Sequence, residues 1–200
     1  MKKFKNVLFS IILTFLLFAS IKAEDSKKAA DFVNNTAGKV INVIESKCSD
    51  EEKQEKLKTI FHQSVNIDWM GKFALGQYYG KLSKQELKEY LIAYREFLTN
   101  TYVSKFTQYN GQDLYIESIK RLSKSQYIVN TKVGNLKNST EQMNIAYRIK
   151  DFGDRCQIRD IIAEGLSVIL AQKSDFTSII SREGTGHLIQ KLRDKMKVIA

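Results

Sequence analysis

The stretch of residues 141–149 reads EQMNIAYRI, and its alternating pattern indicates the fold class. Successive side chains of a β-strand point to opposite faces, so a period of two is typical of a strand. One face of this strand is apolar, and we call it the dry face. The other face is mostly polar, as in an antiparallel sheet covered on one side. The dry positions are Met143, Ile145, Tyr147 and Ile149, and the positions between them are Gln142, Asn144, Ala146 and Arg148.

The same period appears on both sides of this stretch and predicts an antiparallel meander. Turn-forming segments at 123–125, 137–140 and 152–154 separate the alternating runs. The predicted strands are residues 114–122, 126–133, 141–149 and 155–162.

Helical spacing replaces this period in the part of the chain that precedes the strands. Residues from about 26 to 47 are predicted to form an amphipathic helix. Ser49 and Glu52 form a capping box that opens a second helix. Asp68 is expected to cap a short helix over residues 69–75, which Gly76 ends.

The longest predicted helix begins at a second capping box, formed by Ser83 and Glu86. Its apolar residues follow steps of three and four for about six turns, which gives one unbroken apolar stripe. The stripe consists of Leu87, Tyr90, Leu91, Tyr94, Phe97, Leu98, Tyr102 and Phe106.

Helices are predicted again after the strands, at residues 165–173, 174–182 and 185–197, with Gly184 breaking the last two. The fold class is therefore α+β: a curved four-stranded antiparallel sheet whose apolar face is covered by helices. Such an arrangement can close into a solid core or enclose a hydrophobic pocket, and the pattern is compatible with both.

The first 23 residues have the layout of a cleaved secretory signal peptide. Lys2, Lys3 and Lys5 precede an apolar run at residues 7–19, and Ala23 offers a small residue at the cut. An uncleaved anchor is the alternative, although the run is shorter than the roughly 20 residues that span a bilayer. Residues 24–200 then form a single domain outside the cytoplasm.

The chain is basic, with a formal net charge of +10, and loss of the four lysines in residues 1–23 leaves +6. This charge suits anionic lipid surfaces or acidic partners, and it equally suits simple solubility. The basic residues are scattered along an exported chain, which disfavours nucleic acid as a partner.

The residues of common catalytic sites are missing from the sequence. The two histidines, His62 and His187, lie 125 residues apart. Asp160 and Glu164 can be imagined as an acid and base pair, but a strand-end carboxylate and a helix-start carboxylate are the preferred interpretation. The sequence therefore predicts neither an enzyme nor a metal site.

Cys48 and Cys156 are the only two cysteines. An oxidising compartment permits a disulfide between them, but two separate thiols are also compatible with the sequence.

Ten aromatic residues crowd the region from Trp69 to Tyr109. Each buried aromatic side chain removes roughly 150–250 Å² from water. This region is therefore either the core of the domain or the lining of a cavity.

Two segments resemble the MlaC family, which is also called the toluene-tolerance family. The first runs from ALGQYY at residues 74–79 through AYREFL at 93–98 to YNGQ at 109–112. The second is DIIAEGLS at residues 160–167, followed by Ser174-Asp175-Phe176 and by Gly184 through Leu188 to Leu192. The resemblance covers most of residues 65–195.

This resemblance implies a periplasmic phospholipid carrier that works as a monomer without a cofactor or metal. It would shuttle lipids between an outer-membrane lipoprotein complex and an inner-membrane ABC transporter with an MCE-domain ring. Such a system maintains the lipid asymmetry of the outer membrane.

The resemblance also implies that the lipid tails occupy a pocket between the sheet and the helices. Core packing is the alternative for every residue of this predicted lipid-binding set. The set consists of Trp69, Phe73, Tyr78, Tyr94, Phe97, Leu98, Tyr102, Phe106, Ile145, Tyr147 and Ile149. A protein-interaction adaptor with a solid core, or an enzyme on a cone-shaped α+β scaffold, are the competing functions.

The chain departs from the family pattern near the start of the last predicted strand, where Cys156 replaces an aromatic residue. It departs again near the C-terminus, where Gly186 and His187 stand in place of an acidic residue and glycine.

Overall fold

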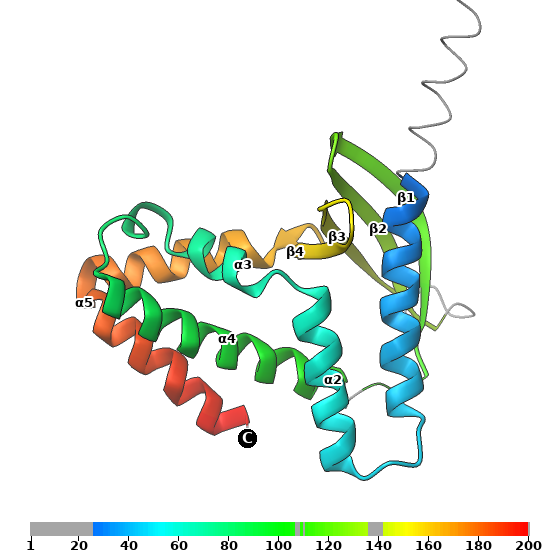
Figure 1. The fold of residues 1–200 in the computed structure, drawn as a ribbon, viewed down its shortest axis with the longest axis horizontal. Helices are drawn as coiled ribbons and strands as arrows, with labels where there is room; N and C mark the ends of the chain where they lie inside the picture. Colours follow the sequence, from blue (N-terminus) through cyan, green and yellow to red (C-terminus); the bar gives the residue numbers. More distant parts are fainter. Residues whose placement is uncertain (1–25, 107–108, 110, 136–141, 200) are drawn as a thin grey trace, which may run out of the picture.

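A computed structural model describes residues 26–106, 109, 111–135 and 142–199 (Figure 1). The predicted signal peptide at residues 1–23 and the predicted turn at 137–140 lie outside these residues. No helix in the described part of the chain is long and apolar enough to cross a membrane.

Helices come first, then the strands of one sheet, then a long helix. An N-terminal helix at residues 26–44 is followed by α2 (Asp50–Ser64), α3 (Ile67–Ala74), the 3₁₀ turn η1 (Gly76–Tyr78) and α4 (Lys84–Phe106). The strands are β1 (Asp113–Ser123), β2 (Gln126–Gly134), β3 (Gln142–Asp151), β4 (Cys156–Ala163) and β5 (Leu166–Ser167), and α5 (Val168–Ile199) ends the chain. The predicted α+β class is confirmed.

The sheet is antiparallel with the order β1-β2-β3-β4-β5, so it has five strands rather than the four predicted. Glu164 and Gly165 both have positive φ, 47° and 80°, which turns the chain back on β4. Leu166 and Ser167 then pair with the end of β4, where a helix starting at residue 165 had been predicted. Glycine adopts this backbone region without strain, which suits Gly165 to the turn.

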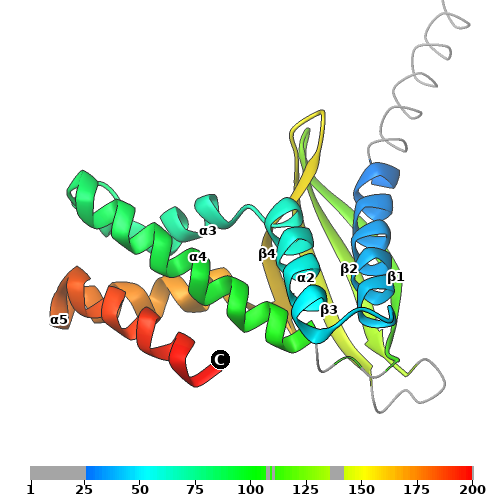
Figure 2. The same cartoon turned by 60° about the horizontal axis from the view of Figure 1, so that its bottom comes forward.

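The molecule has a sheet part and a helical arm. In both views the N-terminal helix lies along the sheet, and α3, α4 and α5 extend beyond the β4 side (Figures 1 and 2). Lys28 of the N-terminal helix forms an ion pair of 2.7 Å with Asp151 at the end of β3. Leu57 and Phe61 of α2 are buried in the core, as their helical spacing indicates.

Local capping signals determine most helix starts. Ser49 Oγ accepts from the Glu52 amide, and Ser83 and Glu86 complete a reciprocal capping box, because each accepts from the other's amide. The short helix α3 is capped by Asn66, whose Oδ1 accepts from the Trp69 amide, so the prediction of Asp68 as its cap is wrong. The backbone N–H of Asn66 donates to the Ile158 carbonyl of β4, and this contact fixes where α3 begins.

The final helix is longer than predicted but breaks where expected. Gly184 interrupts α5 with φ 81° and ψ 168°. The predicted boundary at Ser174 is absent from α5, because this residue continues an unbroken helical run from Val168.

A buried carboxylate joins the sheet to α5. The Asp160 side chain, 1% exposed, accepts from Ser167 Oγ at 2.7 Å and from the Ile169 amide at 3.2 Å. It therefore caps α5, a role that had been expected of Glu164. Glu164 instead accepts from the Asn144 amide at 2.6 Å.

The two cysteines are free thiols, Cys156 buried and Cys48 half-buried. The ammonium group of Lys56 lies 2.9 Å from Cys48 Sγ and lowers the pKa of that thiol.

Replacing Asp160 by alanine is expected to lower the free energy of unfolding by about 3 kcal/mol, because the Ile169 amide and Ser167 hydroxyl lose a buried partner. Urea titration measures the change. Asp154→Ala is the matched control, since Asp154 forms only an exposed pair with Arg155 and its loss should stay within about 0.5 kcal/mol. Equal effects of the two substitutions would contradict the capping role.

Candidate functional site

The dry face of the sheet forms one wall of the candidate site. The register places Tyr127 opposite Ile149, Val129 opposite Tyr147, and Thr131 opposite Ile145. Side chains opposite each other in an antiparallel pair share a face, so these six residues of β2 and β3 form one surface. Three of the predicted lipid-binding residues, Ile145, Tyr147 and Ile149, therefore lie side by side.

Helices α2 and α4 supply the other wall. Phe61 of α2 stacks on Tyr102 of α4 with ring centroids 5.6 Å apart. One residue along α2, His62 Nε2 lies 2.9 Å from the hydroxyl of Thr99, which is itself buried on α4. The two helices are thus fixed to each other next to the sheet.

Polar atoms lie inside this otherwise apolar region. Burial raises the pKa of Tyr147 to about 12, and burial together with the nearby Asp160 and Tyr147 raises the pKa of Tyr102 to about 12. Neither tyrosine hydroxyl has a hydrogen-bond partner among the described residues. The hydroxyl of Thr101, which is also on α4, is buried and has no partner in that part of the chain. Buried polar groups usually have partners, so the Thr101 hydroxyl is an exception. The Tyr102 and Tyr147 hydroxyl oxygens are not fully buried, and both are free to donate to a ligand.

Trp69, Phe73 and Tyr78, which were predicted to touch lipid, belong to a different group of contacts. Trp69 and Phe73 of α3 stack with centroids 5.0 Å apart. The Arg159 guanidinium lies over the Trp69 ring at 4.6 Å, and Lys173 lies over Phe73 at 5.1 Å. Tyr78 in η1 is half-buried beneath the ammonium group of Lys81.

Tyr94 lies in the core of the helical arm. Its ring stacks with that of Tyr90 and meets the edge of Phe176, and its hydroxyl donates to Gln172 of α5 at 2.7 Å. Gly71 of α3 permits this packing, because a Cβ atom there would lie 2.8 Å from the Tyr94 ring.

The remaining predicted residues on α4 differ in burial. Leu98 is fully buried, while Phe97 and Phe106 are half-buried. The ammonium group of Lys195 lies 5.7 Å from the Phe97 ring, so this ring faces the end of α5. Of the predicted α4 residues, Tyr102 is the one that the described contacts link to the sheet wall.

Four residues of the two walls were missing from the predicted set: Phe61, Tyr127, Val129 and Thr131. The β2 residues alternate in sequence just as those of β3 do, so the same period was sufficient to find them. Phe61 carried no comparable signal, because its role depends on how α2 packs against α4.

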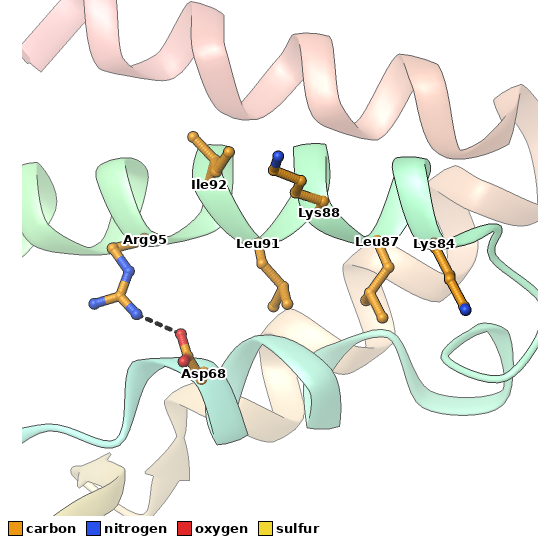
Figure 3. Close-up of a pocket in the computed structure, with 7 residues that line it drawn as sticks. All are labelled: Asp68, Lys84, Leu87, Lys88, Leu91, Ile92 and Arg95. Carbon is orange, nitrogen blue, oxygen red and sulfur yellow. Dashed lines mark hydrogen bonds and ion pairs between the residues drawn. The ribbon is translucent and has the colours of Figure 1, made fainter.

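Two surface grooves lie in the helical arm. One, of about 450 Å³, runs between α3 and α4, where Arg95 and Asp68 form an ion pair at one end of the row that continues with Leu91 and Leu87 (Figure 3). The other, of about 440 Å³, lies between the two segments of α5 and is lined mainly by Phe176, Ile179, Leu188 and Leu192. Neither groove is lined by strand residues.

The described residues contain no group of three His, Cys, Asp or Glu side chains that could hold a metal ion.

Comparison with known proteins identifies the family. The family model described as MlaC protein matches residues 34–194. The chain belongs to the MlaC family. It is 23% identical to the intermembrane phospholipid transport system binding protein MlaC of Haemophilus influenzae, over 96% of this chain and 92% of that protein.

A solved structure has the same fold. The phospholipid-binding protein of Ralstonia solanacearum, solved in complex with a phospholipid, matches with a TM-score of 0.69 and 18% identity. The match covers 84% of this chain and 96% of that chain.

The raised tyrosine pKa values predict a loss of stability in alkali. The unfolded chain releases these protons near pH 10 and the folded protein near pH 12, so the folded state binds more protons between these values. The free energy of unfolding should fall through this window by about 1.4 kcal/mol per pH unit for each tyrosine. Replacing both Tyr102 and Tyr147 by phenylalanine should reduce that slope, as measured by urea unfolding at several pH values. Tyr115→Phe, at a position 57% exposed, should leave it unchanged; equal slopes in all three proteins would refute the assignment.

Proposed function

We propose that this protein is a periplasmic phospholipid carrier that moves lipid between the outer and inner membranes and catalyses no reaction. The observation that carries the proposal is the pair of walls with Tyr147 on the sheet and Tyr102 on α4, apolar apart from hydroxyls without protein partners. Family membership and the names of the two relatives support it.

The physical requirement for such a carrier is enclosure of the acyl chains. A diacyl lipid has on the order of 30 methylene groups, and each costs about 0.8 kcal/mol to expose to water. Free tails in water would therefore cost more than about 20 kcal/mol. The dry face of β2 and β3 offers apolar surface on one side of the tails, and α2 and α4 offer it on the other.

Each part of the lipid has a matching environment. The acyl chains would lie between Ile145, Tyr147 and Ile149 on the sheet and Phe61 and Tyr102 on the helices. The tyrosine hydroxyls would donate hydrogen bonds to the ester oxygens of the glycerol backbone. The charged headgroup would stay in water at the mouth, because burying an unpaired charge is costly.

The tyrosines favour binding over catalysis. A general acid or base works best when its pKa lies near the operating pH. Burial keeps Tyr102 and Tyr147 protonated up to about pH 12, so both hydroxyls are neutral hydrogen-bond donors under physiological conditions.

The proposed partners are an inner-membrane ABC transporter with an MCE-domain ring and an outer-membrane lipoprotein complex. The name of the Haemophilus influenzae relative, a binding protein of a transport system, supports such partners. The carrier itself would use no cofactor, and any energy from ATP would enter through the transporter. This activity would maintain lipid asymmetry of the outer membrane.

Protein purified natively from the periplasm should contain phospholipid. Organic extraction followed by mass spectrometry is expected to give about one phospholipid per chain, because an empty apolar pocket is costly. Absence of lipid from natively purified, folded protein would count against the carrier.

Tyr147→Glu is expected to reduce lipid loading at least tenfold, because it places a charge on the dry face. Tyr115→Glu introduces the same change on β1 at an exposed position and should load normally. Lipid content per chain is measured in both proteins, alongside urea unfolding to compare their stability.

Tyr147→Phe separates a local effect from unfolding, since it keeps the ring. It should retain the fold and lose about fivefold in lipid affinity, the value of one hydrogen bond. Normal loading of folded Tyr147→Glu would exclude the proposed pocket.

A further inference from the structure

A strip of aromatic and basic side chains crosses the end of the sheet and the start of the helical arm. It begins in the turn after β3, continues over β4 and α3, and ends on α5. We call it the aromatic–basic strip, and it consists of Arg155, Phe152, Arg159, Trp69, Phe73 and Lys173.

Each member of the strip lies against the next. The Arg155 and Arg159 guanidinium groups lie 5.5 Å and 5.4 Å from the Phe152 ring. Arg159 also lies 4.6 Å from the Trp69 ring, which stacks on Phe73. Lys173 completes the strip over Phe73. Together the contacts join the turn after β3, β4 and α5 to α3, which lies much earlier in the chain.

The cations of the strip keep donors available. A guanidinium group that lies over a ring uses its face, and its N–H groups remain in the plane of the group. Arg159 is half-buried, and its Nε is buried without a hydrogen-bond partner among the described residues, so its terminal N–H groups are the donors that can reach a phosphate. In that part of the chain no carboxylate pairs with Arg159 or Lys173, and Arg155 pairs only with exposed Asp154. Arginine donors of this kind suit phosphate oxygens.

Exposed apolar side chains accompany the strip. Phe152 is 40% exposed. Leu170, 56% exposed, lies one helical turn before Lys173 on α5, and Leu166, 76% exposed, lies just before α5 begins. Large exposed apolar side chains beside unpaired cations are characteristic of surfaces that meet a membrane.

We propose that the aromatic–basic strip is a docking surface for the anionic face of a phospholipid bilayer. Tryptophan and other aromatic rings favour the headgroup level of a bilayer, and each lysine or arginine near an anionic surface adds attraction. The net positive charge of the chain has the matching sign. Lipid phosphates would accept from Arg155, Arg159 and Lys173, while Phe152 and Leu170 enter the interface. This docking does not depend on the proposed carriage of lipid.

Trp69 is the only tryptophan in the chain, so its fluorescence reports on the strip directly. The protein is produced with its leader and recovered from the periplasm. It is then mixed with vesicles of phosphatidylcholine containing about 30 mol% phosphatidylglycerol, or of phosphatidylcholine alone. We expect flotation with the anionic vesicles and a blue shift of Trp69 emission, both reduced as salt rises. Neutral vesicles should give neither effect.

A matched pair of double variants tests the position of the surface. Arg155→Gln with Lys173→Gln should weaken binding to anionic vesicles roughly 30-fold, since each cation contributes about fivefold. Lys39→Gln with Lys47→Gln removes the same charge from exposed positions in the second half of the N-terminal helix and just after it, and should bind within about twofold of the unaltered protein.

Several results would overturn the proposal. Equal weakening by both double variants would mean that net charge alone drives binding. Flotation without a Trp69 shift would place the contact on another face, and no flotation at all would leave a protein partner as the occupant of the strip. A Trp69 shift that persists in protein separated from the vesicles would report lipid loading instead of docking. Lipid content, measured in parallel, decides the carrier function separately.

Discussion

The buried Asp160 carboxylate fixes the sheet and the helical arm to each other. A buried charge is tolerated only with hydrogen bonds, and Asp160 obtains them from Ser167 and Ile169 at the start of α5. The first turn of α5 therefore has one arrangement relative to β4. Further along, Gln172 and Phe176 of α5 hold Tyr94 of α4. The position of α4 beside the sheet, and with it the approach of Tyr102 to Tyr147, follows from this chain of contacts.

Local signals in the sequence predicted the elements whose causes are local. The Ser83 capping box, the alternation in β3 and the break at Gly184 all need only neighbouring residues, and all three are present. Predictions were wrong where a residue distant in sequence determines the local structure. Asn66 caps α3 because its amide is held by Ile158 of β4, and Ser174 stays helical inside α5, which packs on α3 and α4. Both contacts cross long stretches of sequence.

The candidate site, like the fold, was predictable only where the cause is local in sequence. Period two was sufficient to place Ile145, Tyr147 and Ile149 on one face, but the stripe on α4 did not reveal which of its residues meet that face. Helix α4 has 23 residues and is about 35 Å long. Most of this length lies beyond the sheet, where α4 packs on α3 and α5, and Tyr90 and Tyr94 belong to that packing.

A one-residue bulge in β4 separates the dry face of the sheet from the aromatic–basic strip. Arg148 pairs with Asp160 and Ile149 pairs with Ile158, so Arg159 is an extra residue opposite no partner in β3. Such a bulge re-aims a side chain without changing the alternation on either side. Ile158 and Ile161 thus remain in line with the dry face, while Arg159 reaches Trp69 on α3. Without the bulge, the side chain of residue 159 would point to one of the two faces of the sheet. The bulge lets one short strand serve the apolar wall, the α5 cap and the aromatic–basic strip through consecutive residues.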